Sequence, residues 1–283
     1  MLKKAVIPAA GLGTRLLPIT KELPKEMLPV ITLMKNGRIC LKPMLQAIFE
    51  QLYDVGFKEF VFIVGRGKRA IEDHFLPDED FIQNLKTKNK KDIAEELQGF
   101  YQKLTESNVV FINQPKPKGF GDAVGRAALF TGNENFLMQA GDDLIISKNN
   151  NHLKRAAKIF EEYDADTLFL VEEVPDPRKY GVITGKEIKR GIFKVTGIVE
   201  KPEKPPSNLA IIALYIFKPI IYKAIRKVEP DENGEIQLAD ALKLLIDWNC
   251  KVYGLKLKPN ERRIDIGTAE SYLEMLKSTV IGE

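Results

Sequence analysis

Short apolar runs alternate with amphipathic segments through the first half of the chain, and this alternation predicts strands separated by helices. Strands are expected over residues 5–7, 60–64, 109–112 and 135–138. Helices are expected over residues 43–53, 68–75 and 92–104, and Asp122 is placed to cap a further helix that continues to Phe130. Alternation of this kind is typical of a parallel sheet that helices cover on both faces.

After residue 166 the predicted strands follow one another more closely. They cover residues 167–174, 191–200 and 210–217, with turn-rich segments between them. Helices over 219–228 and 238–248, a strand over 252–257 and a helix over 269–277 complete the pattern. Because no internal repeat or long linker interrupts the chain, we expect one domain over residues 1–283. Its predicted fold class is α/β, with a Rossmann-like, mixed but mainly parallel sheet flanked by helices.

Composition excludes several classes of protein. The 43 basic and 39 acidic side chains give a net charge of +4, which is too balanced to indicate a nucleic-acid-binding protein. The one dense cationic run, at residues 86–91, is expected to be a solvated surface segment. Cys40 and Cys250 allow at most one disulfide and do not form a thiolate metal site. The chain carries no signal-peptide core and no membrane-length apolar run, so we expect a cytoplasmic protein without a membrane partner.

The most informative chemistry lies where the first predicted strand ends. Gly11 and Gly13 let the backbone approach a ligand closely with its N–H groups exposed. Arg15 lies inside the same loop, and Lys25 follows it shortly, so two fixed cations stand beside the glycines. The sequence therefore predicts a site for a polyphosphate.

Two common nucleotide-binding motifs do not match this chain. The loop lacks the Lys-Ser/Thr ending of a Walker A motif, and so does the glycine-rich segment at residues 65–69. Gly119 and Gly121 are followed by Val124, where a dinucleotide-binding fingerprint requires glycine. These departures argue against a P-loop ATPase and against a Rossmann dehydrogenase.

Several motifs do recur together, in one order along the chain. They are GLGTRLLP at 11–18, PKEMLP at 24–29, QPKPKGFGDAV at 114–124, AGDD at 140–143, YGV at 180–182, VEKP at 199–202, SNLAI at 207–211 and EIQLADA at 235–241. Over essentially the whole chain, this series resembles the sugar-1-phosphate nucleotidylyltransferase family. The form PKEMLP is similar to the prokaryotic UTP–glucose-1-phosphate uridylyltransferase (UDP-glucose pyrophosphorylase) branch, whereas thymidylyltransferases tend to place glutamine after the lysine.

The resemblance implies a fold like that of the nucleotide-diphospho-sugar transferases, with a nucleotide-binding half at about 1–145 and a sugar-binding half with C-terminal helices at about 146–283. The implied reaction transfers a uridylyl group from UTP to glucose 1-phosphate, giving UDP-glucose and pyrophosphate by in-line, Mg²⁺-assisted attack. Two anions must meet in this reaction, so the protein has to neutralise charge and align the substrates. No covalent nucleophile is needed.

The resemblance also implies which residues form the site. The catalytic cations would be Arg15, Lys25 and Lys201, of which Arg15 can hold two phosphate oxygens at once. The nucleotide would be bound by Ala9, Ala10, Gly11, Gly13, Glu26, Gln114 and Gly119, with the Gln114 amide on the pyrimidine and Glu26 near the ribose. The sugar phosphate would be bound by Gly181, Glu200 and Lys201. Carboxylates suit Mg²⁺, and the implied ligands are Asp142 and Asp265, with Asp143 an extra neighbour.

Three departures from the family pattern leave alternatives open. Residues 31–42 are longer than the link expected in bacterial members and could form a hairpin beside the active site or an oligomer contact. Asp122 stands where many bacterial uridylyltransferases have histidine, and the segment 265–268 is closer to the thymidylyltransferase form.

These departures leave a second candidate function, that of an enzyme that uses dTTP or several nucleotides. A third is a non-catalytic nucleotide-binding regulatory paralogue, which the retained cations and Asp142 disfavour. Family resemblance implies a homo-oligomer, either a dimer or a tetramer.

Overall fold

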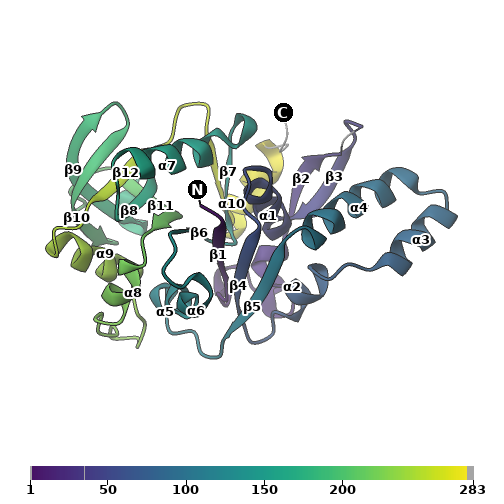
Figure 1. The fold of residues 1–283 in the computed structure, drawn as a ribbon, viewed down its shortest axis with the longest axis horizontal. Coiled ribbons are helices and arrows are strands. Elements are labelled where there is room, and N and C mark those ends of the chain that lie inside the picture. Colours follow the sequence, from purple (N-terminus) through teal and green to yellow (C-terminus); the bar gives the residue numbers. More distant parts are fainter. Residues whose placement is uncertain (1, 35, 279–283) are drawn as a thin grey trace.

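A nine-stranded sheet runs through the molecule, with β5 at one edge and β9 at the other (Figure 1). The computed structural model describes residues 2–34 and 36–278. In spatial order the strands are β5 (Asn108–Gln114), β4 (Glu59–Gly65), β1 (Lys4–Ala9), β6 (Phe136–Gln139), β11 (Leu209–Phe217), β8 (Thr167–Glu173), β12 (Val252–Lys256), β10 (Ile192–Glu200) and β9 (Gly181–Lys189).

Strand directions divide this sheet into a parallel part and a mixed part. β5, β4, β1 and β6 pair in parallel, as the alternation of strands and helices predicts. β11 pairs antiparallel with β6 and β8, and β12 lies parallel to β8. β10 pairs antiparallel with β12 and β9, while β9 also pairs with β11 through Val182 and Ala210. This end of the sheet therefore curls back on itself.

The remaining elements cover the sheet and extend from it. The helices are α1 (Met44–Asp54), α2 (Arg69–His74), α3 (Glu79–Thr87), α4 (Lys91–Thr105), α5 (Phe120–Arg126), α6 (Ala128–Thr131), α7 (Asn151–Glu162), α8 (Ile220–Ile225), α9 (Leu238–Asp247) and α10 (Ala269–Ser278). Two small antiparallel sheets join β2 (Pro29–Leu33) to β3 (Ile39–Pro43) and β7 (Asp143–Ile146) to β13 (Arg262–Asp265). Figure 1 shows α3 and α4 at the opposite end of the molecule from β9 and β10. No helix in the described part of the chain has the length and apolar content to cross a bilayer.

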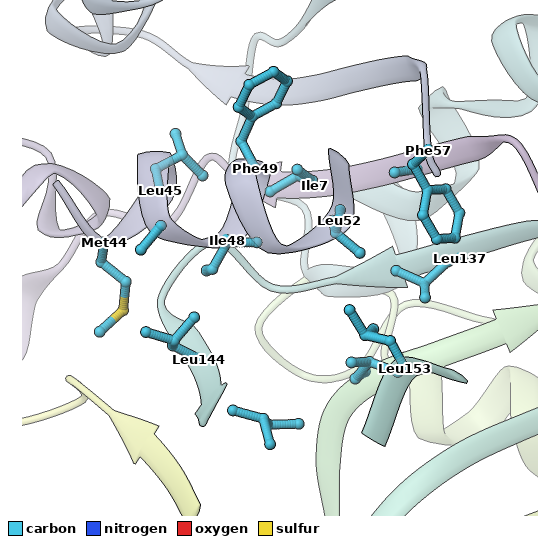
Figure 2. Packing of buried hydrophobic residues seen from close by; sticks show 14 of the residues in the cluster. Ile7, Met44, Leu45, Ile48, Phe49, Leu52, Phe57, Leu137, Leu144 and Leu153 are labelled. Atoms are coloured by element: carbon cyan, nitrogen blue, oxygen red, sulfur yellow. The ribbon is translucent and has the colours of Figure 1, made fainter. Parts of the chain in front are cut away.

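The central strands are buried on both faces, so successive residues enter two different apolar clusters. In β1, Ile7 belongs to one cluster and Val6 to the other. Helix α1 covers the first face with Leu45, Phe49 and Leu52, whose spacing of three and four residues forms one apolar stripe. Figure 2 shows these side chains packed around Ile7. A strand buried on both faces explains why β1 and β4 appear in the sequence as unbroken apolar runs.

The predicted elements named above are present, with ends that differ by a few residues, but one prediction about a helix start is wrong. α5 begins at Phe120, not after Asp122, because Gly119 with φ of +90° turns the chain into the helix earlier. Asp122 makes no cap; it binds the side chains of Gln114 and Arg126. The helix also ends at Arg126, and α6 follows as a separate turn.

Several elements were not predicted. The outer half of β9 is polar and exposed, so it has the composition of a turn, and its strand conformation depends on pairing with β10. The sequence also did not predict α3 or the β7–β13 pair. Residues 31–33 and 39–42 do form a hairpin, since they belong to the paired strands β2 and β3. Cys40 and Cys250 are both free thiols.

Candidate active site

The glycine loop follows β1 directly and presents Arg15 at the surface of a cavity. Gly13 has a left-handed backbone (φ +66°), which glycine adopts without strain, and its carbonyl accepts a 2.7 Å hydrogen bond from the Thr20 hydroxyl. A short 3₁₀ turn at Thr14–Leu16 follows, in which Leu16 is buried and Arg15 exposed. Leu16 thus anchors the loop while the guanidinium remains free to meet a ligand.

Another 3₁₀ turn, Lys25–Met27, brings Lys25 against Asp142. The Lys25 ammonium donates to the Asp142 carboxylate across 117 positions of sequence. Burial acts to lower the pKa of Lys25, but the ion pair with Asp142 outweighs it and the net pKa lies above the ordinary value. Lys25 is therefore a cation at neutral pH, although most of its side chain is enclosed.

Asp142 reaches this position because glycine precedes it at the end of β6. The Gly141 N–H donates to the Pro8 carbonyl at 2.9 Å, which ties the turn to β1. A Cβ on Gly141 would lie 2.9 Å from Leu45 Cδ1 and 3.2 Å from the Pro8 oxygen, so a larger residue would displace the turn. The close approach fixes Asp142 beside Lys25.

Two cavities meet at this ion pair. The first cavity, of about 490 Å³, contains most of the predicted nucleotide-binding residues: Ala10, Gly11, Gly13, Glu26, Gln114 and Gly119. The second cavity, of about 550 Å³, contains the predicted sugar-phosphate and metal residues: Gly181, Glu200, Lys201, Asp142 and Asp265. Both are lined by Arg15, Lys25, Phe120, Asp142 and Gly267. The structure therefore brings the predicted residues into one continuous site, apart from Ala9, which ends β1 buried and does not line either cavity.

One wall of the first cavity is a loop whose shape depends on glycine. The Gln114 amide donates to the Gly119 carbonyl at 3.1 Å and to the Asp122 carboxylate at 2.8 Å, which orients its side chain. A Cβ on Gly119 would lie 2.7 Å from the Ile236 oxygen, and the Gly121 N–H donates to that same oxygen at 2.8 Å. The segment around Ile236 therefore supports the loop that carries Gln114.

The second cavity has its own glycine and lysine. A Cβ on Gly181 would lie 2.9 Å from a Glu200 carboxylate oxygen, so glycine lets Glu200 lie over the start of β9. Lys201 adopts a left-handed backbone (φ +42°), unusual for a side chain of its size, and its N–H donates to the Tyr180 carbonyl at 3.0 Å. Strain of this kind is often found at ligand-binding positions. The Lys201 ammonium lies 3.5 Å from Glu200 and remains largely exposed.

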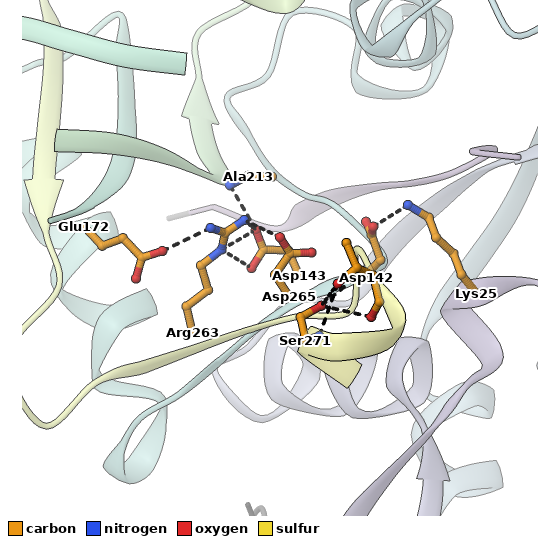
Figure 3. Close-up of polar contacts among 9 residues, drawn as sticks. Lys25, Asp142, Asp143, Glu172, Ala213, Arg263, Asp265 and Ser271 are labelled. Carbon is orange, nitrogen blue, oxygen red and sulfur yellow. Dashed lines mark hydrogen bonds and ion pairs between the residues drawn. The ribbon is translucent and has the colours of Figure 1, made fainter. Parts of the chain in front are cut away.

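Arg263, which sequence reasoning missed, organises the carboxylates of the second cavity. Its guanidinium binds Asp143 at 2.8 Å, Glu172 at 3.0 Å and Asp265 at 3.4 Å (Figure 3). Burial raises the pKa of Asp143 to about 6, although Arg263 acts to lower it. The Asp143 side chain, whose orientation the sequence left open, is thus part of an internal ion-pair network. The only signal in the sequence was an arginine two residues before Asp265. Its role as a partner of Asp143 could be recognised only by knowing that β13 pairs with β7.

Asp142 and Asp265 form the carboxylate pair that could receive a metal. Asp265 pairs with Asp143 in the β13–β7 register, and the Ile266 N–H lies 3.4 Å from the Asp142 carbonyl oxygen. A Cβ on Gly267 would lie 3.1 Å from Asp265 and 3.3 Å from Arg15, so this glycine lets the two side chains approach each other. Within residues 2–34 and 36–278, no group of three or more His, Cys, Asp or Glu side chains is arranged to hold a metal. A cation here would need further oxygens from a bound substrate.

Sequence reasoning also missed Lys68 and Phe120. Lys68 is buried beside Glu26, and Phe120 lines both cavities at their junction. Lys68 lies where the glycine-rich segment 65–69 meets the helix predicted over 68–75, and neither pattern indicates a buried partner for its side chain. Hairpin β2–β3 does not line either cavity, so of the two interpretations of residues 31–42 the position beside the active site is not supported.

Known proteins resemble this chain in sequence and in structure. A family model described as nucleotidyl transferase matches residues 4–280. A putative UTP–glucose-1-phosphate uridylyltransferase of Methanocaldococcus jannaschii is 40% identical over 279 residues, covering 97% of this chain and 92% of the relative. The UTP–glucose-1-phosphate uridylyltransferase of Pseudomonas aeruginosa is 37% identical over 279 residues, covering 97% and 94%.

A solved structure extends the comparison to the whole fold. A UDP-glucose pyrophosphorylase in complex with UDP-glucose matches with a TM-score of 0.84 and 33% identity, and the match covers 98% of both chains. The predicted α/β fold, with its mixed sheet and flanking helices, is confirmed.

Proposed function

Because this chain belongs to the nucleotidyl transferase family, we propose that it transfers a uridylyl group from UTP to glucose 1-phosphate, forming UDP-glucose and releasing pyrophosphate. The observation that carries this proposal is the meeting of two cavities at Lys25 and Asp142. One cavity contains the glycine loop and the glutamine loop, and the other contains Glu200 and Lys201. A reaction between two bound phosphate compounds requires this arrangement.

The residues of the junction neutralise the charge that the reaction concentrates. A phosphate oxygen of glucose 1-phosphate attacks the α-phosphorus of UTP, and the bond from that phosphorus to the bridging oxygen of the β-phosphate breaks. Arg15 lies at the glycine loop, where it stabilises the leaving pyrophosphate. Lys25, protonated because of its pair with Asp142, offsets charge at the α-phosphate, and Lys201 holds the sugar phosphate in line.

The substrate assignments are those that the family resemblance implies, and the lining of each cavity supports them. In the first cavity Gln114 and Gly119 would contact the uracil ring, Glu26 the ribose, and the loop from Ala10 to Gly13 the phosphates. In the second, Gly181 and Glu200 would contact the glucose hydroxyls. In this proposal the nucleotide-binding half is about residues 1–145 and the sugar-binding half about residues 146–283.

We propose Mg²⁺ as the divalent cation, with Asp142 and Asp265 as its protein ligands. The donor set fits: Asp142 and Asp265 are both among the carboxylates that line the second cavity, and Mg²⁺ commonly uses one or two carboxylates together with substrate phosphates. The bound ion would supply positive charge to the phosphate oxygens of the substrates. Removal of divalent cations with EDTA should abolish turnover and added Mg²⁺ should restore it, whereas full activity in EDTA would contradict the assignment.

We further propose a homo-oligomer, a dimer or a tetramer, with the hairpin β2–β3 as a contact. Its register places four apolar side chains on one face: Ile31, Leu33, Ile39 and Leu41. Ile39 is 67% and Leu41 63% exposed, which is unusual for side chains of this size. Light scattering should give a multiple of the 32.0 kDa chain mass, and the double substitution of Ile39 and Leu41 by Ser should reduce it. A monomeric wild type would overturn this.

We propose the cytoplasm as the compartment in which the enzyme works. Both cysteines are free thiols, as is usual where glutathione keeps thiols reduced. Cell fractionation with an antibody to the native protein would check this, and recovery outside the cytoplasmic fraction would contradict it.

A substrate panel tests which nucleotide and which sugar 1-phosphate the enzyme uses. Pyrophosphate release should be measured with UTP, dTTP, CTP, ATP and GTP, each combined with several sugar 1-phosphates. We expect efficient turnover with UTP and glucose 1-phosphate. Equal efficiency with dTTP would favour the nucleotide-promiscuous alternative, to which the thymidylyltransferase-like form of 265–268 points. Absence of release with every pair would favour a non-catalytic nucleotide-binding paralogue.

A further inference from the structure

Lys68 is a buried cation whose role the reaction scheme above does not explain. It lies between β4 and α2, its side chain is only 9% exposed, and it does not line either cavity. Its ammonium donates to Glu26 Oε2 at 2.8 Å. Burying a lysine is costly, so its partner must provide compensation.

Glu26 occupies an unusual place for a carboxylate. It is 1% exposed, it follows Lys25 in the same 3₁₀ turn, and it lines the first cavity. Its Cγ packs against the backbone of Gly141, next to Asp142. Burial raises the pKa of Glu26, and Lys68 is the largest influence that opposes this. Since Oε2 is bound to Lys68, Oε1 is the oxygen that can accept a hydrogen bond from a molecule in the cavity.

The chemistry of the cavity restricts what that oxygen can bind. A carboxylate repels phosphates, so in a nucleoside triphosphate site it has to face hydrogen-bond donors. The base lies at the Gln114 loop in the proposed binding mode and the phosphates lie at the glycine loop with Lys25, so the ribose occupies the space between them. The 2′ and 3′ hydroxyls are the donors available there.

We propose that Lys68 is a positioning residue that holds Glu26 in place as a charged acceptor for a ribose hydroxyl, and so sets the preference for ribonucleotides over deoxyribonucleotides. This inference rests on the proposed function and deepens it. Lys68 acts only through Glu26 and never touches the nucleotide. A charge-assisted hydrogen bond is stronger than a neutral one, so loss of Lys68 weakens recognition of the hydroxyl selectively.

A purely structural role for the Lys68–Glu26 pair is the competing explanation, and the chain offers a matched control for it. Lys42 is also a poorly exposed lysine, at 12%, and it binds Glu50 at 2.8 Å and Glu96 at 2.7 Å. Lys42 does not line either cavity. Substitution of Lys42 therefore reports the cost of breaking a buried ion pair away from the nucleotide.

The test compares UTP with dUTP and 3′-deoxy-UTP, at fixed glucose 1-phosphate, in the wild type and in the variants Lys68→Met, Lys68→Arg and Lys42→Met. We expect the wild-type kcat/KM for UTP to exceed that for at least one deoxy analogue by about tenfold to hundredfold, the range of one charge-assisted hydrogen bond. Lys68→Met should bring that ratio near unity, mainly by raising KM for UTP. Lys68→Arg should retain most of the preference. Lys42→Met should lower the melting temperature and leave the ratio unchanged.

A double-mutant cycle shows whether Lys68 acts through Glu26. In the Glu26→Gln background, Lys68→Met should have no further effect on the UTP to deoxy-UTP ratio. The double variant removes both buried charges and leaves neither one unpaired. It therefore still tests the inference if Lys68→Met alone does not fold.

Two results would overturn the inference. One is a wild type that does not discriminate UTP from either analogue, and the other is a Lys68→Met or double variant that retains the wild-type ratio. In both cases normal turnover with UTP would leave the proposed function intact. A wild type without UTP turnover would overturn the proposed function and this inference together.

Discussion

Lys25 and Asp142 are the side chains on which the two cavities converge, and each is the other's ion-pair partner. In the proposed reaction both would act on charge that develops as the phosphorus is attacked, so their contribution should appear in turnover more than in binding. The Lys25 side chain is 16% exposed and the Asp142 side chain 19%. Because both lie at the junction of the cavities, truncating either one leaves no large internal hole.

We predict that Lys25→Ala and Asp142→Ala each lower kcat by about 10³-fold, the scale of a lost electrostatic contact in the transition state. Melting temperatures should stay within a few degrees of the wild type. Lys103→Ala is a suitable control, because Lys103 pairs with Asp54 at 2.8 Å and does not line either cavity. Wild-type kcat in either cavity variant would refute the assigned roles.

His152 provides a separate prediction at the residue scale, on stability. It is fully buried, its Nδ1 lies 2.7 Å from the Ser147 hydroxyl, and its Nε2 has no hydrogen-bond partner in the described structure. Burial lowers its pKa to about 4 from an ordinary value of 6.5. The unfolded chain therefore binds a proton more readily than the folded protein between these values, and acid destabilises the fold in this window.

We expect the His152 contribution to the free energy of unfolding to fall by about 2 kcal/mol between pH 7 and pH 5. Asp143 titrates in the opposite sense, because its raised pKa favours the folded state as pH falls. The comparison must therefore be the difference between the wild type and His152→Gln in urea unfolding at both pH values. A difference that is independent of pH would contradict the buried neutral histidine.

At the scale of elements, the site is assembled from the carboxyl ends of parallel strands. The glycine loop follows β1, Gln114 ends β5, Asp142 follows β6, and Lys68 follows β4. Ligands in open α/β sheets commonly bind at this edge. The loop after β5 has a further requirement, since Gly119 and Gly121 both lie against Ile236.

Gly121→Ala should disturb this loop. Its Cβ would lie 2.7 Å from the Ile236 oxygen, which is too close for the loop to keep its position. We predict that KM for UTP rises by about tenfold or more while KM for glucose 1-phosphate changes little, because small displacements of binding groups are costly. Gly125→Ala in the same helix should have a much smaller effect, since its Cβ would meet only an Ile225 side-chain methyl, at 3.3 Å, and no backbone atom. Equal effects of the two substitutions would contradict the role of the loop.

Sequence alone located the parts of the site that follow predicted strands. Arg15, Lys25, Asp142 and Gln114 all lie in local motifs beside apolar runs, so their neighbourhood could be predicted from the chain itself. Arg263 and Lys68 could not, because their partners Asp143 and Glu26 are 120 and 42 positions away. The start of α5 was mispredicted because a capping aspartate was favoured over the positive φ of Gly119.

At the scale of the whole molecule, one sheet runs through both halves of the chain. Parallel strands β5, β4, β1 and β6 support the first cavity, and the curled end formed by β11, β8, β12, β10 and β9 carries Gly181 and Glu200 of the second. β11 pairs with β6 and with β8, so the two parts share hydrogen-bonded strands. In the proposed reaction the two substrates are therefore bound on one continuous framework.

With both substrates bound on this framework, the proposed reaction is a direct transfer without a uridylyl group attached to the protein. The most direct measurement is the stereochemical outcome with UTP that carries sulfur at one diastereotopic oxygen of the α-phosphate, followed by ³¹P nuclear magnetic resonance of the UDP-glucose product. One in-line displacement between the two cavities predicts inversion of configuration at the α-phosphorus. Retention would show two successive displacements through a covalent intermediate, and would contradict the account.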